Sequence, residues 1–190
     1  MTTPSGARHV GPYDILHSRP VYENPWIKVR EDKVRTGGGE ESTFGVVTMR
    51  PGVTVLPIAE SGEVHLVREF RYALGEETLE AVSGAIQSGE TPEMAGLREL
   101  TEELNLIASQ WVYLGVVNPF TTIVHAPNHL FLAQDLSSTR RAPQVEERLG
   151  PVRMPFEEAV RAVLRGQITH AASCVLILKA QAFLERKGRK

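Results

Sequence analysis

The sequence predicts an α/β protein that begins with a small antiparallel β module. Two alternating segments, 26–35 and 44–49, flank the turn-forming stretch GGGEES and predict strands joined as a hairpin or meander. Beyond residue 50, strand-like apolar runs alternate with segments of helical period, which is the pattern of an α/β domain. With 190 residues, of which 42% are hydrophobic and 23% charged, the chain can bury one full core.

Strand patterns continue after the β module. The runs 53–58 and 64–69 are separated by the turn sequence AESGE and predict a second hairpin. The runs 111–117 and 129–133 predict two further strands. They are joined by NPFTTIVHAPN, a loop whose two prolines prevent regular pairing and which is long enough to touch a substrate.

The chain ends in two predicted helices. The first covers 155–164 and carries Glu157 and Glu158 where they favour the N-terminal end of the helix dipole. The second covers 171–186 and follows Thr169, a residue type that caps helices. No repeat or low-complexity run interrupts this order of elements.

The segment 84–106, GAIQSGETPEMAGLRELTEELNL, carries the strongest functional pattern. Thr91 followed by Pro92 predicts a helix start, because threonine caps helices and proline is tolerated at the first helical position. Asn105 predicts the helix end, since asparagine can take the left-handed conformation.

Three carboxylates fall on one face of this helix. At about 100° per residue, Glu102 and Glu103 lie roughly 60° and 40° to either side of Glu99, so we expect an outward acidic face. The predicted core-facing stripe consists of Leu97, Leu100 and Leu104. Crowded carboxylates repel one another, and a hard cation such as Mg2+ or Mn2+ relieves that repulsion. The alternative, a solvated surface helix, gives no reason for this spacing.

The spacing in this segment resembles the Nudix hydrolase pattern Gx5Ex7REUxEExGU, where U is a bulky aliphatic residue. Eight of its nine fixed positions match, namely Gly84, Glu90, Arg98, Glu99, Leu100, Glu102, Glu103 and Leu106. Asn105 replaces the second glycine, which is a mild departure because asparagine tolerates positive φ.

The resemblance covers roughly residues 21–184 and points to the ADP-ribose or nucleoside-diphosphate-sugar pyrophosphatase branch. It rests on VYENPWIKVREDKV, VHLVREFRY, LEAVSG, WVYLGVVNPF and HLFLAQDL, in that order. It implies the Nudix fold, an α/β/α sandwich with a mixed β-sheet, preceded by the antiparallel β module. The implied divisions are a flexible N-terminus over 1–12, a dimerising β module over 13–50 and a Nudix hydrolase domain over 51–187.

The resemblance also implies a metal site on the acidic helix. Glu99 and Glu103 would be the main ligands, Glu102 a ligand or bridging contact, and the backbone carbonyl of Ser83 a further ligand. Arg98 would orient the carboxylates by pairing with them. Gly84 and Glu90 would support the loop before the helix.

Other residues would bind substrate or take the proton of the attacking water. Arg71, and after it Arg68, match an arginine-bearing strand that contacts substrate phosphate, to which a guanidinium is suited by its bidentate fork. Glu80 would contact the substrate or brace the metal site. The general base in this branch is a glutamate from a late loop, which makes Glu147 the first choice here and Glu146 the second.

The implied reaction is Mg2+-dependent hydrolysis of the pyrophosphate bond of a nucleoside diphosphate sugar, with ADP-ribose, cleaved to AMP and ribose 5-phosphate, as the best guess. Mn2+ is a possible substitute. The sequence departs from the branch at Val82, Ser83 and Phe120, which leaves open GDP-mannose, another nucleotide sugar, a dinucleoside polyphosphate or a nucleoside triphosphate. A non-catalytic ADP-ribose sensor is a further alternative, against which the intact glutamates argue.

Composition limits the expected partners. A net charge of −2 gives no electrostatic attraction for nucleic acid or an anionic membrane, so we expect neither. No apolar run reaches the length of about 18 residues that a membrane helix needs. Cys174 is the single cysteine and cannot form an internal disulfide. We therefore expect a cytoplasmic protein, and the resemblance implies a homodimer.

Overall fold

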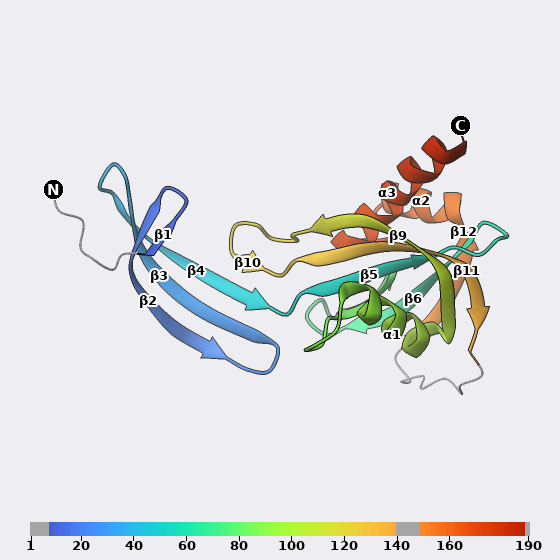
Figure 1. The fold of residues 1–190 in the computed structure, drawn as a ribbon, viewed down its shortest axis with the longest axis horizontal. Helices are drawn as coiled ribbons and strands as arrows, with labels where there is room; N and C mark the ends of the chain where they lie inside the picture. The colour runs from blue at the N-terminus through green and yellow to red at the C-terminus, as the bar shows by residue number, and fades with distance from the viewer. Residues whose placement is uncertain (1–7, 140–148, 189–190) are drawn as a thin grey trace. The chain divides into compact units, whose positions relative to one another are not determined.

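The computed structural model describes residues 8–139 and 149–188 of the chain (Figure 1). The chain divides into two compact units, one formed by 1–50 with 118–126 and the other by 51–117 with 127–190. The first unit is a β-sheet, and the second combines strands with helices. This arrangement confirms the predicted α/β class with an N-terminal antiparallel module.

The N-terminal unit contains a sheet in the order β1-β2-β3-β4-β10. Its strands are β1 (Arg8–Val10), β2 (Tyr13–Glu23), β3 (Ile27–Thr36), β4 (Glu41–Met49) and β10 (Val124–His125). β3 and β4 pair antiparallel, so the first predicted strand pair is confirmed. β10 pairs parallel with β4, Val124 lying opposite Val47. The prediction that the loop forms no regular pairing is therefore wrong at β10, because this segment contains no proline and its backbone can pair.

The second unit contains two sheets, in the orders β8-β5-β11-β9 and β12-β6-β7. The first is built from β5 (Gly52–Pro57), β8 (Val82–Ala85), β9 (Leu106–Val117) and β11 (Asn128–Ser138). The second is built from β6 (Glu63–Arg71), β7 (Glu76–Glu80) and β12 (Leu149–Pro155). β5 and β11 are parallel and the other pairs antiparallel, so the first of these sheets is mixed.

The predicted hairpin between β5 and β6 is wrong. Beyond a single bridge between Ile58 and Val64, the two strands diverge into different sheets. β5 is paired on both sides, by β8 and by β11. Five consecutive residues, 53–57, are buried, which is the pattern of a central strand covered on both faces and not of a half-exposed hairpin strand.

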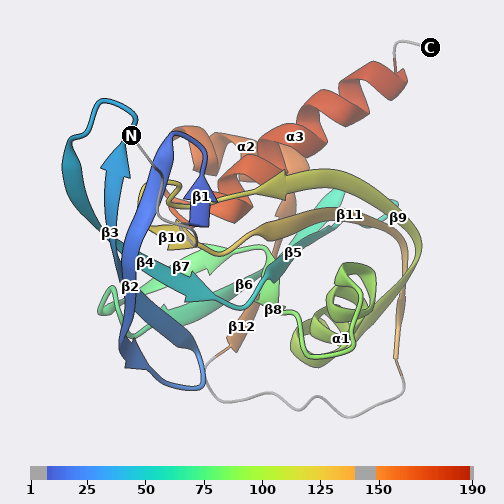
Figure 2. The same cartoon turned by 60° about the vertical axis from the view of Figure 1, so that its left-hand side comes forward.

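Helices cover both faces of the mixed sheet (Figure 2). The described helices are α1 (Pro92–Leu104), α2 (Phe156–Leu164) and α3 (Ala171–Gly188). α1 has the predicted ends: the Thr91 side chain accepts a hydrogen bond of 3.2 Å from the backbone N–H of Met94, and Asn105 has a φ of 54°. No helix of the described residues is long and apolar enough to cross a bilayer.

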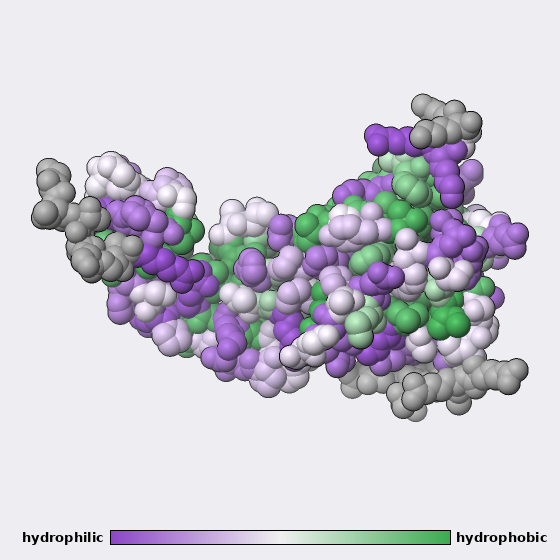
Figure 3. Space-filling model, in the orientation of Figure 1, coloured by the Kyte–Doolittle hydropathy of each residue, from purple (hydrophilic) through white to green (hydrophobic). Residues whose placement is uncertain are grey.

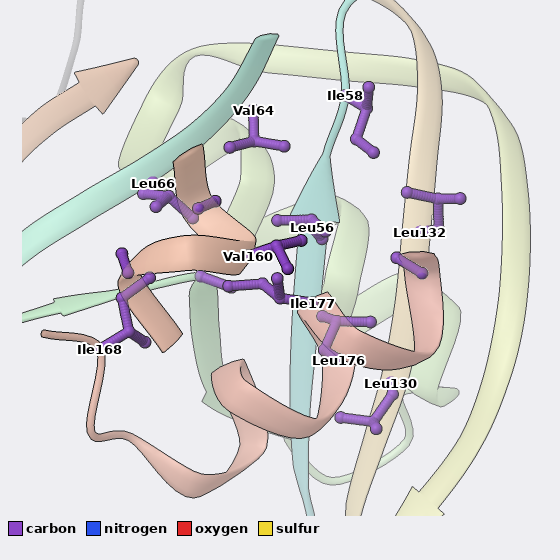
Figure 4. Close-up of a cluster of buried hydrophobic side chains, with 14 of the residues drawn as sticks. Leu56, Ile58, Val64, Leu66, Leu130, Leu132, Val160, Ile168, Leu176 and Ile177 are labelled. Atoms are coloured by element: carbon purple, nitrogen blue, oxygen red, sulfur yellow. The ribbon is translucent and has the colours of Figure 1, made fainter. Parts of the chain in front are cut away.

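Alternation along the strands produces two cores. On β5, Leu56 packs in the cluster with α2 and α3 (Figure 4), whereas Val53 and Val55 pack in the cluster with α1. On β11, Leu130 and Leu132 belong to the first cluster and Phe131 to the second. One face of the mixed sheet therefore packs against α2 and α3 and the other against α1, which is the predicted α/β/α layering.

Candidate active site

The buried face of α1 overlaps the predicted leucine stripe only in part. Leu97 is 40% exposed, whereas Ala95, Gly96 and Leu100 are buried. A Cβ on Gly96 would lie 3.1 Å from a methyl group of Val55, so the absence of a side chain lets the helix pack close to the sheet. The predicted stripe is therefore confirmed at Leu100 and Leu104, which pack in the core cluster, and wrong at Leu97. The acidic residues do not all point into solvent.

Glu99 lies against the backbone of β8. A Cβ built on Gly84 would overlap its carboxylate, so only glycine leaves room for the acid at this position. The Glu99 side chain is 13% exposed. Burial raises the pKa of this carboxyl group, although Arg98 opposes the shift. The first glycine of the motif thus forms the space that Glu99 occupies.

Glu103 is the acid of the helix with the strongly raised pKa. Its Oε2 atom is buried and has no hydrogen-bond partner within the described residues. Burial raises its pKa to about 8, and the negative charges of Glu99 and Glu69 add to this effect. A buried carboxylate oxygen without a partner is costly. A divalent cation bound beside it would remove this cost, so the residues present fit a metal site.

Arg98 connects the helix to the loop before it. Its Nε donates a hydrogen bond of 2.8 Å to Glu90, and its Nη2 donates one of 3.0 Å to the carbonyl of Ala85. Its Nη1 donates to Glu99 at 2.6 Å and to Glu102 at 3.1 Å. These bonds support the roles that the sequence assigns to Arg98 and Glu90, because one guanidinium holds the loop and two of the acids.

The acids do not yet form a closed cation cage. Across 8–139 and 149–188, no group of three or more Asp, Glu, His or Cys side chains is arranged as a formed metal site. Glu102 is 50% exposed and contacts Arg98. Glu99 and Glu103 are the acids that burial already holds beside β8, where the backbone of Ser83 hydrogen bonds to Glu103. These groups could hold a divalent ion, and Glu102 could join them.

Arg71 forms a second centre beside the acids. Its Nε and Nη2 donate hydrogen bonds of 2.9 and 2.5 Å to the two carboxylate oxygens of Glu80, and its Nη1 lies 2.9 Å from Glu69. Its charge also opposes the rise in the pKa of Glu103, which places the two side chains in one electrostatic environment. The Arg71 side chain remains 33% exposed and so is accessible to a ligand.

The remaining predicted residues are placed differently. Arg68 is exposed and, three residues from Arg71 on β6, points to the opposite face of the strand, so the structure does not bring the two together. Glu80 is 2% exposed and binds Arg71, so it braces the arginine. Glu146 and Glu147 lie outside the described residues.

Sequence reasoning missed three residues near this centre: Glu69, His170 and Ser173. Glu69 shares a strand face with Arg71 at a spacing of two, a pattern that could have identified it. His170 and Ser173 reach Glu80 and Ala81 from about 90 residues away in the sequence, and no local pattern predicts such contacts.

Comparison with known families agrees with this geometry. A family model described as the NUDIX domain matches residues 48–173. The chain belongs to the Nudix family. A second model, described as the nucleoside diphosphate sugar hydrolase N-terminal domain, matches residues 14–47 of this Nudix hydrolase. The expected family and its pyrophosphatase class are thereby confirmed.

Individual relatives span most of this Nudix hydrolase. An ADP-ribose pyrophosphatase of Mycobacterium tuberculosis is 27% identical over 174 residues, 90% of this chain and 84% of the relative. An ADP-ribose pyrophosphatase of Bacillus subtilis is 24% identical over 159 residues, 83% of this chain and 86% of the relative. A crystal structure described as an ADP compounds hydrolase has a TM-score of 0.83 at 22% identity, covering 97% of this chain and 100% of its own, and shows the same fold.

Proposed function

We propose that this Nudix hydrolase cleaves the pyrophosphate bond of ADP-ribose, a nucleoside diphosphate sugar, into AMP and ribose 5-phosphate with Mg2+ as its metal. The observation that carries the proposal is the buried, unpartnered Oε2 of Glu103 beside Glu99. An acidic site of this kind is suited to a divalent cation, and the braced guanidinium of Arg71 is suited to a diphosphate. The two ADP-ribose pyrophosphatases named above support ADP-ribose as the substrate.

Each acid of the motif has a separate role in this proposal. Glu99, Glu103 and the backbone carbonyl of Ser83 would hold the metal, and Glu102 would join as a ligand or bridging contact. When bound, the metal supplies charge neutralisation at the phosphoryl oxygens and lowers the pKa of a bound water. Arg98 keeps two of the carboxylates oriented through the hydrogen bonds described above.

Two further groups complete the proposed chemistry. Arg71 binds a phosphate oxygen of the substrate through the part of its guanidinium that faces solvent. A glutamate accepts the proton of the attacking water, and Glu147 is our first candidate, followed by Glu146. Replacing each of the two by glutamine distinguishes them, because only the replacement of the general base should lower kcat, by about 100-fold or more.

The N-terminal β module is proposed to form the interface of a homodimer in the cytoplasm. Its strands and turns leave Val21, Tyr22 and Trp26 exposed by 52%, 55% and 69%. Hydrophobic residues reach the surface in several separate green areas of Figure 3. Exposed aromatic side chains are enriched at protein interfaces. Analytical ultracentrifugation tests the oligomeric state, and a monomer at micromolar concentration would contradict the dimer.

The substrate is tested by chromatography of products after incubation with ADP-ribose, GDP-mannose, UDP-glucose, a dinucleoside polyphosphate and dGTP, each with Mg2+ or with EDTA. We expect AMP and ribose 5-phosphate from ADP-ribose with Mg2+ alone, and loss of both with Glu103→Gln. Preferential cleavage of another compound would reject ADP-ribose and retain the hydrolase. Absence of turnover for every compound would contradict the proposed reaction and favour a binding protein.

A further inference from the structure

Two side chains at the start of α3 contact the segment that joins β7 to β8. His170 directly precedes the helix and Ser173 lies in its first turn. His170 Nδ1 lies 3.1 Å from Oε2 of Glu80, the last residue of β7. The Ser173 Oγ accepts a hydrogen bond of 2.9 Å from the backbone N–H of the next residue, Ala81. The two contacts therefore fix consecutive residues of the strand junction.

The contact between His170 and Glu80 has a defined polarity. Burial opposes ionisation of Glu80, but hydrogen bonds from Arg71 and Thr78 outweigh it and lower its pKa, so the carboxylate acts only as an acceptor. The approach of His170 Nδ1 at 3.1 Å is favourable in the tautomer that carries the proton on this nitrogen. The Ser173 hydroxyl lies 2.8 Å from the same nitrogen, so Nδ1 of His170 contacts both Ser173 and Glu80.

Glu80 is held on both oxygens. Oε1 accepts from Arg71 Nε at 2.9 Å and from Thr78 Oγ1 at 2.6 Å. Oε2 accepts from Arg71 Nη2 at 2.5 Å and faces His170 Nδ1. A bidentate pair is nearly coplanar, so the orientation of this buried carboxylate determines the orientation of the guanidinium.

This orientation matters because the side chain proposed to bind phosphate and those proposed to bind the metal belong to different parts of the fold. Arg71 belongs to the β12-β6-β7 sheet, whereas Glu99 and Glu103 lie on α1, which packs on β5 and β8. Ala81 is the residue at which the chain passes from β7 to β8. Displacement of a binding group by about 1 Å can lower a rate by about 100-fold. A fixed junction between β7 and β8 therefore keeps Arg71 at a constant position relative to Glu99 and Glu103.

We propose that His170 and Ser173 are positioning residues for Arg71, acting through Glu80 and Ala81 to set where the diphosphate of the substrate binds relative to the acidic helix. The inference rests on the proposed function in one respect, that Arg71 binds substrate phosphate. His170 contacts neither substrate nor metal in this role. Its contribution is to hold one carboxylate in one orientation.

The test compares two amides at residue 170. His170→Asn places an N–H donor near the position of Nδ1, whereas His170→Gln places its donor farther out, near the position of Nε2. His170→Ala removes the donor, Ser173→Ala removes the second contact, and Cys174→Ala in the same helical turn is the control. Binding of ADP and of ADP-ribose is measured by calorimetry in EDTA, and kcat, KM and Mn2+ affinity are measured separately.

We expect His170→Ala and His170→Gln to weaken ADP binding and to raise KM by roughly 10-fold, because Arg71 loses its fixed orientation. His170→Asn and Cys174→Ala should stay within about twofold of the unmodified protein, as should the Mn2+ affinity of every variant. If His170→Ala does not fold, the difference in ADP binding between His170→Asn and His170→Gln tests the inference. Equal ADP binding by folded Asn and Gln variants, or Mn2+ affinity that falls in parallel with ADP affinity, would overturn the inference.

The binding data also separate this inference from the proposed substrate. If the unmodified protein binds ADP but does not hydrolyse ADP-ribose, the proposed substrate fails, and a difference in ADP binding between the two amides still supports the positioning role. If the unmodified protein does not bind ADP in EDTA, Arg71 does not form a phosphate site in the free protein, and the inference is rejected even where ADP-ribose is hydrolysed.

Discussion

Replacing Glu103 by glutamine should stabilise the metal-free protein. Burial raises the pKa of this carboxyl group from 4.5 to about 8. Between these values the folded form keeps a proton that the unfolded form has released. The free energy of unfolding is therefore highest below pH 4.5 and falls as the pH rises towards 8. At pH 7 the loss extends over about 2.5 pH units, which at about 1.36 kcal/mol per unit gives about 3 kcal/mol. Glutamine has nearly the same shape and does not titrate.

The assay is urea unfolding in EDTA at pH 5, 7 and 8.5. We expect the free energy of unfolding of Glu103→Gln to exceed that of the unmodified protein by up to about 3 kcal/mol at pH 7 and by much less at pH 5. The matched control is Glu102→Gln, one residue earlier and 50% exposed, which should change stability by less than about 0.5 kcal/mol. Mg2+ at about 1,000 times Kd should reverse the order, because only the unmodified protein then gains about 4.1 kcal/mol.

Two results would refute this reasoning. One is a Glu103→Gln variant that is less stable than the unmodified protein at pH 7 in EDTA. The other is a stability difference that does not shrink between pH 7 and pH 5. Either result would mean that the carboxylate of Glu103 is already compensated without metal, and the argument for a cation at this position would lose its main support.

The remaining predictions concern three other positions. Gly84→Ala should displace the Glu99 carboxylate and weaken Mn2+ binding by at least about 10-fold, measured by electron paramagnetic resonance; because a flexible side chain can move aside, unfolding should change by less than about 1 kcal/mol. Arg71→Lys should raise KM for ADP-ribose by about 10-fold or more, since lysine lacks the bidentate fork, whereas Arg68→Lys should leave it within about twofold; equal effects would reject the assignment of Arg71. Thr91→Ala should cost about 1 kcal/mol in urea unfolding through loss of the helix cap, and an unchanged midpoint would show that the cap contributes nothing.

Local patterns in the sequence predicted the ends of α1 correctly. Thr91 and Asn105 act through their own backbone neighbours, so a few adjacent residues contain the whole interaction. The fixed spacing of Gly84, Glu90, Arg98 and the acids predicted the motif for the same reason. Their contacts lie within one loop and one helix.

Contacts between distant segments were not predictable in this way. The pairing of β5 with β11 instead of β6 depends on which strand completes the sheet, and alternation within β5 carries no information about its partner. The rotation of α1 depends on Gly96 fitting against Val55, a contact that a helical wheel does not contain. The support of Glu80 by His170 joins residues about 90 positions apart.

The short strand β10 also limits how this protein could be divided. The polypeptide passes between the two units after Arg50, after Val117 and after Ala126, because 118–126 belongs with the N-terminal sheet. Removing 1–50 would therefore leave the backbone of Val124 and His125 without β4, its partner strand. A single proteolytic cut cannot release either unit intact. The N-terminal sheet and the hydrolase domain cannot be exchanged among proteins as independent modules unless the inserted segment travels with the sheet.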